Sequence, residues 1–148
     1  VIISVLIGVT GYSLRGRMMG YRIENQVKGM YADLMNARAR AMQQNRSHFV
    51  LVTATTFQII EDSDESGAIN AGDDVIITRT WQYPSLVFPV TITMNTRGII
   101  ESDDIIPPAD DTTINFDIGN NAPDYDCIRL FATRIYTGRM EGANCVVK

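Results

Sequence analysis

The first fourteen residues of the chain, VIISVLIGVTGYSL, are mostly apolar and carry no charged side chain, and Arg15 and Arg17 follow them directly. A helix needs about 20 apolar residues to cross a bilayer, whereas a run of about 10 to 14 more often belongs to a buried core helix. The run therefore predicts either part of a membrane-resident helix or a core helix of a cytosolic protein. Gly8, Gly11 and the lack of an N-cap favour the first interpretation.

The residues after this run predict that the helix continues to about residue 46. Apolar side chains recur at the i, i+3, i+4 and i+7 spacing of one helical face, at Val27, Met30, Tyr31, Leu34, Ala37 and Ala41. The opposite side is expected to be solvated, and its charged residues are Arg22, Glu24, Lys28, Asp33, Arg38 and Arg40. We therefore expect one helix over residues 1–46, whose first part lies in a membrane or in the core of an assembly.

From His48 onward the chain changes to short runs rich in β-branched and aromatic residues, separated by turn residues. The predicted strands are 48–54, 56–60, 75–81, 90–94, 112–118 and 127–135. The polar segments 103–111 and 119–126 are expected to be surface loops. The sequence thus predicts the α+β class, with one long N-terminal helix packed on an antiparallel β-sheet domain over residues 47–148.

Composition restricts the chemistry. The net charge of −4 gives no general attraction to nucleic acids, so binding of DNA or RNA would need a local basic patch. Two cysteines and one histidine are too few for a zinc site of Cys and His ligands. The lone His48 favours no catalytic triad, and Gly16–Gly20 lacks the lysine and the preceding strand of a phosphate-binding loop. We expect a protein that is not an enzyme.

One acidic segment has the spacing of a calcium loop. Counted from Asp62, oxygen-bearing side chains occupy positions 1, 3, 5, 9 and 12 of a twelve-residue loop, namely Asp62, Asp64, Ser66, Asn70 and Asp73. Gly67 stands at position 6, where the loop needs a sharp turn. The flanking residues favour strands, however, and the last carboxylate is Asp. The alternatives are a calcium site, which would be the only cofactor of the protein, or a solvated acidic hairpin loop.

Cys127 and Cys145 lie near the C-terminus. A bond between them would stabilise the fold by about 3 kcal/mol in the loop-entropy estimate, and would indicate a location outside the cytoplasm. Two unpaired buried thiols are the alternative.

Three segments carry a family resemblance. Residues 31–45, YADLMNARARAMQQN, followed by a strand, resemble the type IV pilin superfamily, and more narrowly the H-type pseudopilin of type II secretion and related minor pilins of type IV pili. Met94–Gly98 resembles the Arg-Gly element between a strand and a turn in that branch. Ile135–Arg139 resembles its C-terminal Gly-Arg hairpin, and pilins often carry a disulfide in this region.

The resemblance implies a structural subunit of a pilus or pseudopilus. It implies about a dozen further residues before Val1, including a glutamate used in assembly. It also implies that the β-sheet domain over residues 47–148, here called the head, lies on the periplasmic side of a bacterial inner membrane or on an extracellular filament. The expected partners are other pilin or pseudopilin subunits and, before assembly, the inner membrane. The residues expected to pack against neighbouring helices are Ile3, Leu6, Ile7, Gly8 and Tyr12.

Two other functions stay open. A related branch binds DNA during uptake, which would need a basic C-terminal tip. Arg134 and Arg139 are the candidate contacts here, although the net negative charge of the chain argues against nucleic acid as a partner. The other is a cytosolic binding module that responds to calcium.

Overall fold

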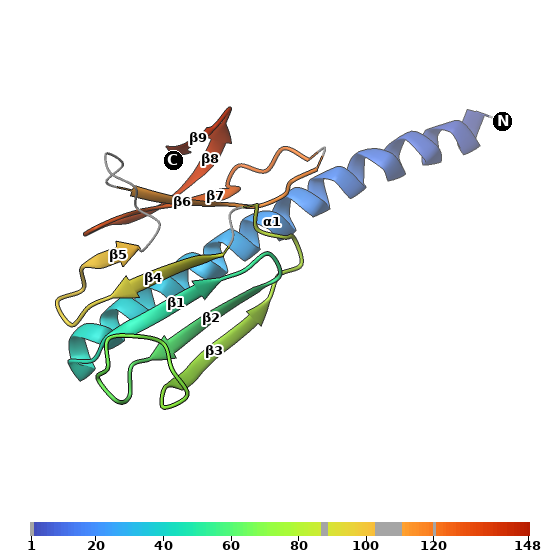
Figure 1. The fold of residues 1–148 in the computed structure, drawn as a ribbon. Helices are drawn as coiled ribbons and strands as arrows, with labels where there is room; N and C mark the ends of the chain where they lie inside the picture. Colours follow the sequence, from blue (N-terminus) through green and yellow to red (C-terminus); the bar gives the residue numbers. More distant parts are fainter. Residues whose placement is uncertain (1, 87–88, 103–110, 120) are drawn as a thin grey trace.

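The computed structural model describes the backbone of residues 2–86, 89–102, 111–119 and 121–148, and the side chains of these ranges from Met18 onward. The elements are α1 (Ile2–Gln44), β1 (His48–Val52), β2 (Thr56–Glu61), β3 (Asp74–Thr80), β4 (Val90–Met94), β5 (Ile100–Ser102), β6 (Asp111–Asn115), β7 (Cys127–Phe131), β8 (Ile135–Glu141) and β9 (Asn144–Val147). Figure 1 shows α1 running along the sheets with its C-terminal half, while its N-terminal end extends beyond them.

The strands form two antiparallel sheets, in the orders β3-β2-β1-β4-β5 and β6-β7-β8-β9. In the first sheet β1 is central, because it pairs with both β2 and β4. The sheets are joined by the Ile100 N–H, which donates to the Ala132 carbonyl at 2.8 Å, and by the Leu86 N–H, which donates to the Asn115 carbonyl at 2.9 Å. The predicted α+β class, with one helix packed on antiparallel sheets, is confirmed.

The apolar face of α1 packs against both sheets. Its buried side chains are each at most 1% exposed, and they are Ile23, Val27, Met30, Leu34, Ala37 and Ala41. This confirms the predicted helical stripe, apart from Tyr31, which is only partly buried. Asp33, expected on the solvated side, is only 6% exposed. That expectation was wrong because Arg79 of β3 pairs with its carboxylate.

Helix α1 ends at Gln44, two residues before the predicted end. Asn45 adopts a positive φ of 55°, a conformation that asparagine tolerates better than most residues. The Arg46 N–H then donates to the Ala41 carbonyl at 3.2 Å. This is the Schellman arrangement, which satisfies a terminal carbonyl and turns the chain into β1.

Aromatic rings join the first sheet to the second. The ring centroid of Trp81 lies 5.5 Å from that of Phe57 and 5.3 Å from that of Phe116. Phe57 belongs to β2, whereas Phe116 follows β6 and forms an isolated bridge with Ser85. Aromatic pairs at these distances stabilise beyond the area they bury, by about 0.5–1.5 kcal/mol each.

The C-terminal strands differ most from the prediction. Residues 127–135 were expected to form one strand, but β7 ends at Phe131 and Ile135 begins β8. The chain turns there because the Phe131 N–H donates to the Arg134 carbonyl at 2.8 Å. Strand β5 was not predicted. The segment Ile135–Arg139, which resembles a hairpin element, lies in β8, and β8 pairs antiparallel with β9 as the first strand of a C-terminal hairpin.

The turn between β4 and β5 packs on the helix. Gly98 has a φ of 73°, and a Cβ added there would lie 2.7 Å from the Met42 sulfur. The Arg38 Nε–H donates to the Gly98 carbonyl at 2.7 Å. The Arg97-Gly98 element therefore follows a strand and makes a turn, as the sequence predicts, and only glycine fits at position 98 without strain.

Two further expectations concern segments that the structure describes only in part. In the part of the chain that the structure describes, no helix combines the length and the apolar character needed to cross a membrane. The predicted loop 103–111 lies outside the described residues except for Asp111, which begins β6.

Candidate functional site

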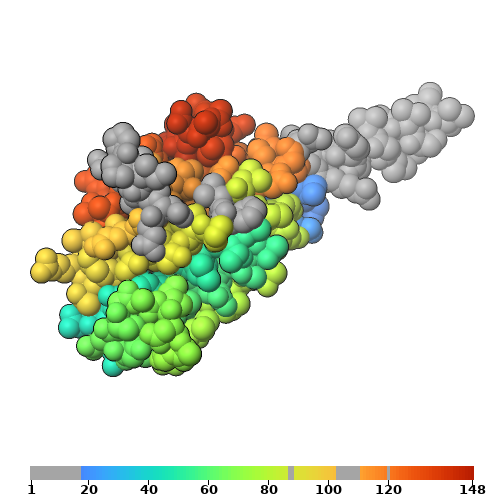
Figure 2. Space-filling model, viewed as in Figure 1, coloured from blue at the N-terminus to red at the C-terminus, as the bar shows by residue number. Residues whose placement is uncertain are grey.

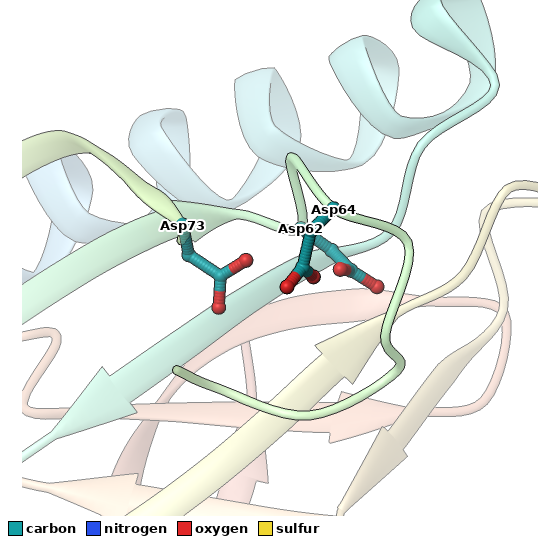
Figure 3. Close-up of side chains that lie close together, drawn as sticks. All are labelled: Asp62, Asp64 and Asp73. Atoms are coloured by element: carbon teal, nitrogen blue, oxygen red, sulfur yellow. The ribbon is translucent and has the colours of Figure 1, made fainter. Parts of the chain in front are cut away.

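The acidic segment forms the loop of a β-hairpin. β2 ends at Glu61, β3 begins at Asp74, and the two strands pair antiparallel. The flanks are therefore strands, as their composition predicts, and not the helices of an EF-hand. Figure 3 shows the carboxylates of Asp62, Asp64 and Asp73 close together across the mouth of this loop, and one oxygen from each lies within 4.8 Å of the others.

Backbone amides hold the first carboxylate of the loop. Asp62 is 3% exposed. Its Oδ1 accepts from the Ser66 N–H at 2.9 Å, and its Oδ2 accepts from the Gly67 N–H at 3.0 Å. Glu65 and Gly67 have φ angles of 58° and 74°, which bring these amides back toward Asp62. Gly67 thus occupies the turn that its place in the sequence predicts.

Asn70 organises the second half of the loop as a hydrogen-bond donor. Its Nδ2 donates to the Asp64 Oδ2 at 2.9 Å and to the Ser66 Oγ at 2.7 Å. Its Oδ1 accepts from the Gly72 N–H at 2.6 Å, and its backbone N–H donates to the Asp73 Oδ2 at 2.8 Å. In this orientation the amide nitrogen of Asn70 faces Asp64, whereas a calcium ion would need the amide oxygen.

The loop therefore brings all five predicted ligands close to one another, the three carboxylates as a cluster and the other two through hydrogen bonds to that cluster. Asp62, Asp64 and Asp73 converge, whereas Ser66 and Asn70 cross-link the loop; the Ser66 hydroxyl donates to the Ala68 carbonyl at 2.9 Å. Two oxygens bound to one calcium ion at about 2.4 Å each lie at most about 4.8 Å apart. The three carboxylates are consequently close enough to share one ion.

The carboxylates of the loop differ in their electrostatic and hydrogen-bonding environments. Hydrogen bonds from Ser66 and then Asn70 lower the pKa of Asp64 below its usual value. The Oδ1 atom of Asp73 is buried and accepts no hydrogen bond from the described residues. A bound cation would offset the repulsion among the three carboxylates and occupy the free lone pairs of Asp73. This is the chemistry that the loop can provide.

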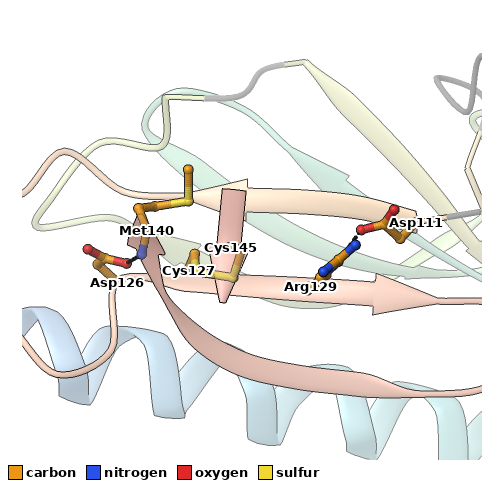
Figure 4. Close-up of a disulfide and its surroundings, with 6 residues drawn as sticks. All are labelled: Asp111, Asp126, Cys127, Arg129, Met140 and Cys145. Carbon is orange, nitrogen blue, oxygen red and sulfur yellow. Dashed lines mark hydrogen bonds and ion pairs between the residues drawn. A yellow bond between two sulfur atoms is a disulfide. The ribbon is translucent and has the colours of Figure 1, made fainter. Parts of the chain in front are cut away.

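The two cysteines form a disulfide across β8, with the Cα atoms 6.1 Å apart. Cys127 lies on β7 and Cys145 on β9, and both flank β8 (Figure 4). A Cβ added to Gly138 of β8 would lie 2.3 Å from the Val146 carbonyl oxygen and 3.0 Å from the Cys145 sulfur. The sheet therefore curls closely around Gly138. The predicted pairing is confirmed, and the alternative of two free thiols is wrong.

A buried carboxylate lies beside this disulfide. Asp126 is 1% exposed, and its Oδ1 accepts from the Met140 N–H at 2.6 Å (Figure 4). Burial raises the pKa of Asp126 above its usual value, although this hydrogen bond and the charge of Arg139 act in the opposite direction. Sequence reasoning did not single out Asp126. Its position directly before Cys127 was the available signal.

The predicted DNA contacts do not form one patch. Arg134 lies in the turn before β8, where its Nη1 donates to the Tyr136 hydroxyl at 3.1 Å, whereas Arg139 lies near the far end of that strand. Five residues of extended chain span about 17 Å, and an odd separation places side chains on opposite faces of a strand. The other cation of these strands, Arg129, is paired with Asp111.

The structure places the residues predicted to pack against neighbouring helices only by their backbone. Ile3, Leu6, Ile7, Gly8 and Tyr12 belong to α1, and their side chains lie outside the described residues. His48 is fully buried at the start of β1, with its Nδ1 3.2 Å from the Arg46 carbonyl oxygen. It occupies a packing position at the junction of helix and sheet.

With this geometry established, we compared the chain with known proteins. Neither the family models, nor the curated proteins, nor the solved structures contain a match to it.

Proposed function

We propose that this protein is a structural subunit of the type IV pilin or pseudopilin kind, which assembles through its N-terminal helix and is not an enzyme. One observation carries the proposal: a single helix of 43 residues joins the uncharged N-terminal run to the core of the head. Among the helix residues whose side chains the structure describes, Gly20 is the first that is buried, and 18 helical residues precede it. At 1.5 Å per residue they extend about 27 Å beyond it.

The contacts of the helix support a mechanical role. Gln26 binds the loop after β3, since its Nε2 donates to the Tyr83 carbonyl at 2.8 Å and its Oε1 accepts from the Gln82 N–H at 3.0 Å. On the other side, the Glu24 Oε1 accepts from the Asp124 N–H at 2.9 Å. The head is thus fixed to α1 close to the point where the helix leaves it. A force applied along the helix would be transmitted directly to both sheets.

The proposal places the N-terminal helix in the inner membrane before assembly and among the helices of neighbouring subunits afterwards, with the head in the periplasm or on a filament. The disulfide supports an oxidising location for the head. Burial of the uncharged run and close helix packing at Gly8 and Gly11 would supply the driving force. We do not propose DNA binding, because Arg134 lies in the turn before β8 and Arg139 lies near the far end of that strand.

Cysteine crosslinking in cells tests the assembly role. Single cysteines at Ile3, Ile7 and Tyr12 of the full chain should form crosslinks to other subunits, because these positions precede the head on α1. The described residues contain no free cysteine that would add background. A cysteine at Thr78, exposed on β3, is the control and should capture far less. Capture of no other subunit from any helix position would refute the assembly role.

A further inference from the structure

The surface where α1 leaves the head combines exposed apolar and cationic side chains. Met18, Met19 and Tyr21 are 58%, 42% and 65% exposed. Arg22 is also exposed, and it forms no hydrogen bond or ion pair with the described residues. Figure 2 shows the first described side chains, in blue, at the edge of the head. Together with Arg15 and Arg17 in the sequence, they define a segment, residues 15–22, that we call the collar.

The collar differs sharply in charge from the head. Over residues 1–46, Lys and Arg outnumber Asp and Glu by seven to two, whereas over residues 47–148 they are outnumbered by fifteen to six. Residues 1–23 contain no acidic residue at all. The acidic residue nearest in sequence is Glu24. Its carboxylate accepts from the Asp124 N–H and lies 3.8 Å from the Lys28 ammonium. Residues 15–22 therefore contain no carboxylate that could neutralise their three arginines.

We propose that the collar binds the headgroups of anionic phospholipids at the surface of the membrane that holds the N-terminal run; this inference rests on the proposed function. Arginine and tyrosine side chains are typical of the boundary between hydrocarbon and water, where their apolar parts are buried and their polar ends reach the headgroups. An anionic leaflet attracts such a segment, and the effect is lost beyond the Debye length. The acidic head would be repelled from the same surface and held away from it.

An acidic surface of a second copy fits the collar less well. Two acidic residues of the head already have partners: Asp111 is paired with Arg129, and Asp62 accepts two backbone amides. Such a surface would also leave the exposure of Tyr21 and Met18 unexplained. The position of the collar agrees better with a lipid surface, because Gly20 is buried next to Pro123 and the head begins immediately there.

Vesicle flotation of the full chain tests this inference. Vesicles of phosphatidylcholine alone are compared with vesicles in which about a third of the lipid is phosphatidylglycerol, at low and at high salt. The measured quantity is the ratio of binding to the two vesicle types. We expect a ratio well above one at low salt that falls at high salt. The variant Arg15→Ser/Arg17→Ser/Arg22→Ser should weaken binding to the anionic vesicles about fivefold per cation removed, or about 100-fold in all.

Two control variants separate the collar from general charge effects. Arg40→Ser/Arg97→Ser/Lys148→Ser removes the same charge from exposed positions away from the collar, and it should keep the ratio of the parent. Arg15→Lys/Arg17→Lys/Arg22→Lys should also keep it, because the charge is retained. Circular dichroism verifies that each variant is folded.

The outcomes separate this inference from the proposed function. Equal flotation of the parent with both vesicle types, or an equal loss in the Arg40/Arg97/Lys148 variant, would overturn the role of the collar and leave the assembly role standing. No flotation with either vesicle type would count against the membrane location itself. Collar-dependent binding to a short DNA duplex, without a preference for anionic vesicles, would also overturn the lipid assignment.

Discussion

Arg79, on the edge strand β3, holds Asp33 of α1 in a two-point ion pair. Arg79 Nη2 donates to Asp33 Oδ1 at 3.0 Å, and its Nε donates to Asp33 Oδ2. Asp33 is nearly buried, while the side chain of Arg79 is 55% exposed. The pair raises the pKa of Arg79 through this hydrogen bond and the charge of Asp33. It ties the outermost strand of the larger sheet directly to the helix.

We expect Asp33→Asn to lower the free energy of unfolding by about 1 kcal/mol, because Arg79 is partly solvated and the pair is screened. Urea unfolding of Asp33→Asn, Arg79→Gln and the double variant measures the coupling between them. The two losses should be less than additive in the double variant. Strict additivity would show that the ion pair contributes nothing to stability.

Gly138 should not tolerate a side chain. A Cβ there would lie 2.3 Å from a backbone carbonyl oxygen, so Gly138→Ala should lower the free energy of unfolding by about 1–3 kcal/mol or more. Gly29→Ala is the matched control: Gly29 lies on the exposed side of α1 with no atom within 4 Å of an added Cβ. That change should stabilise by about 0.5–1 kcal/mol through helix propensity. Thermal unfolding of both variants provides the comparison, and equal effects would contradict the close packing at Gly138.

Reduction of the disulfide should destabilise the head. Cys127 and Cys145 are 18 residues apart, and a loop of that length corresponds to about 3 kcal/mol in the entropy model. Urea unfolding with and without dithiothreitol measures the difference. The variant Cys127→Ala/Cys145→Ala should be about as stable as the reduced parent and insensitive to the reductant. A midpoint that dithiothreitol does not change in the parent would contradict this expectation.

The acidic hairpin loop should bind calcium weakly if its three carboxylates act together. Calorimetric titration of the chain with Ca²⁺ should give a dissociation constant of about 10⁻⁴–10⁻³ M, the range of extracellular modules. Asp73→Asn should abolish the binding, since Asp73 provides one of the clustered oxygens. Asp74→Asn is the matched control, because Asp74 lies outside the cluster and accepts from the Ser63 hydroxyl. If the two variants gave the same calcium titration, the loop would be a solvated acidic loop and not a calcium site.

Asp126 and Asp64 should give opposite pH dependences. The pKa of Asp126 is raised by burial, so its ionised form costs stability above the folded pKa. Asp126→Asn keeps an oxygen acceptor for the Met140 N–H, and its stability relative to the parent should rise from about pH 3 to about pH 7. The pKa of Asp64 is lowered, so its ionised form adds stability that is lost as the pH falls through the folded pKa. The relative stability of Asp64→Asn should therefore fall over the same interval. The same trend in both variants would refute the assignment.

Local patterns predicted the parts of the fold that depend on neighbours in the chain. The helical stripe from Val27 to Ala41 and the strands around the acidic loop appear where periodicity and composition indicate. Over residues 127–135 the prediction was wrong, because the composition favours a strand throughout the segment and therefore predicts one strand. The turn after Phe131 comes with a hydrogen bond from Ile100 to Ala132, a residue far along the chain, which no local pattern records.

The sequence likewise predicted only part of the candidate site. The spacing of Asp62, Asp64 and Asp73 predicted their convergence, because a twelve-residue loop with Gly67 at its turn brings its ends together. The same spacing suggested Asn70 as a ligand. The folded loop instead directs its amide nitrogen to Asp64, since the amide oxygen is taken by the Gly72 N–H. Which end of an amide faces a cluster depends on the hydrogen bonds around it.

By itself, the amino-acid sequence determined that one uncharged run leads into a long amphipathic helix and that a β-rich region follows, because these features depend on residues a few positions apart. Only the tertiary structure decided that Arg79 covers Asp33, that a disulfide crosses Gly138, and that Arg134 and Arg139 lie apart. The physical reason is that strand pairing and burial join residues far apart in the chain, and the free energy of those contacts overrides local preference.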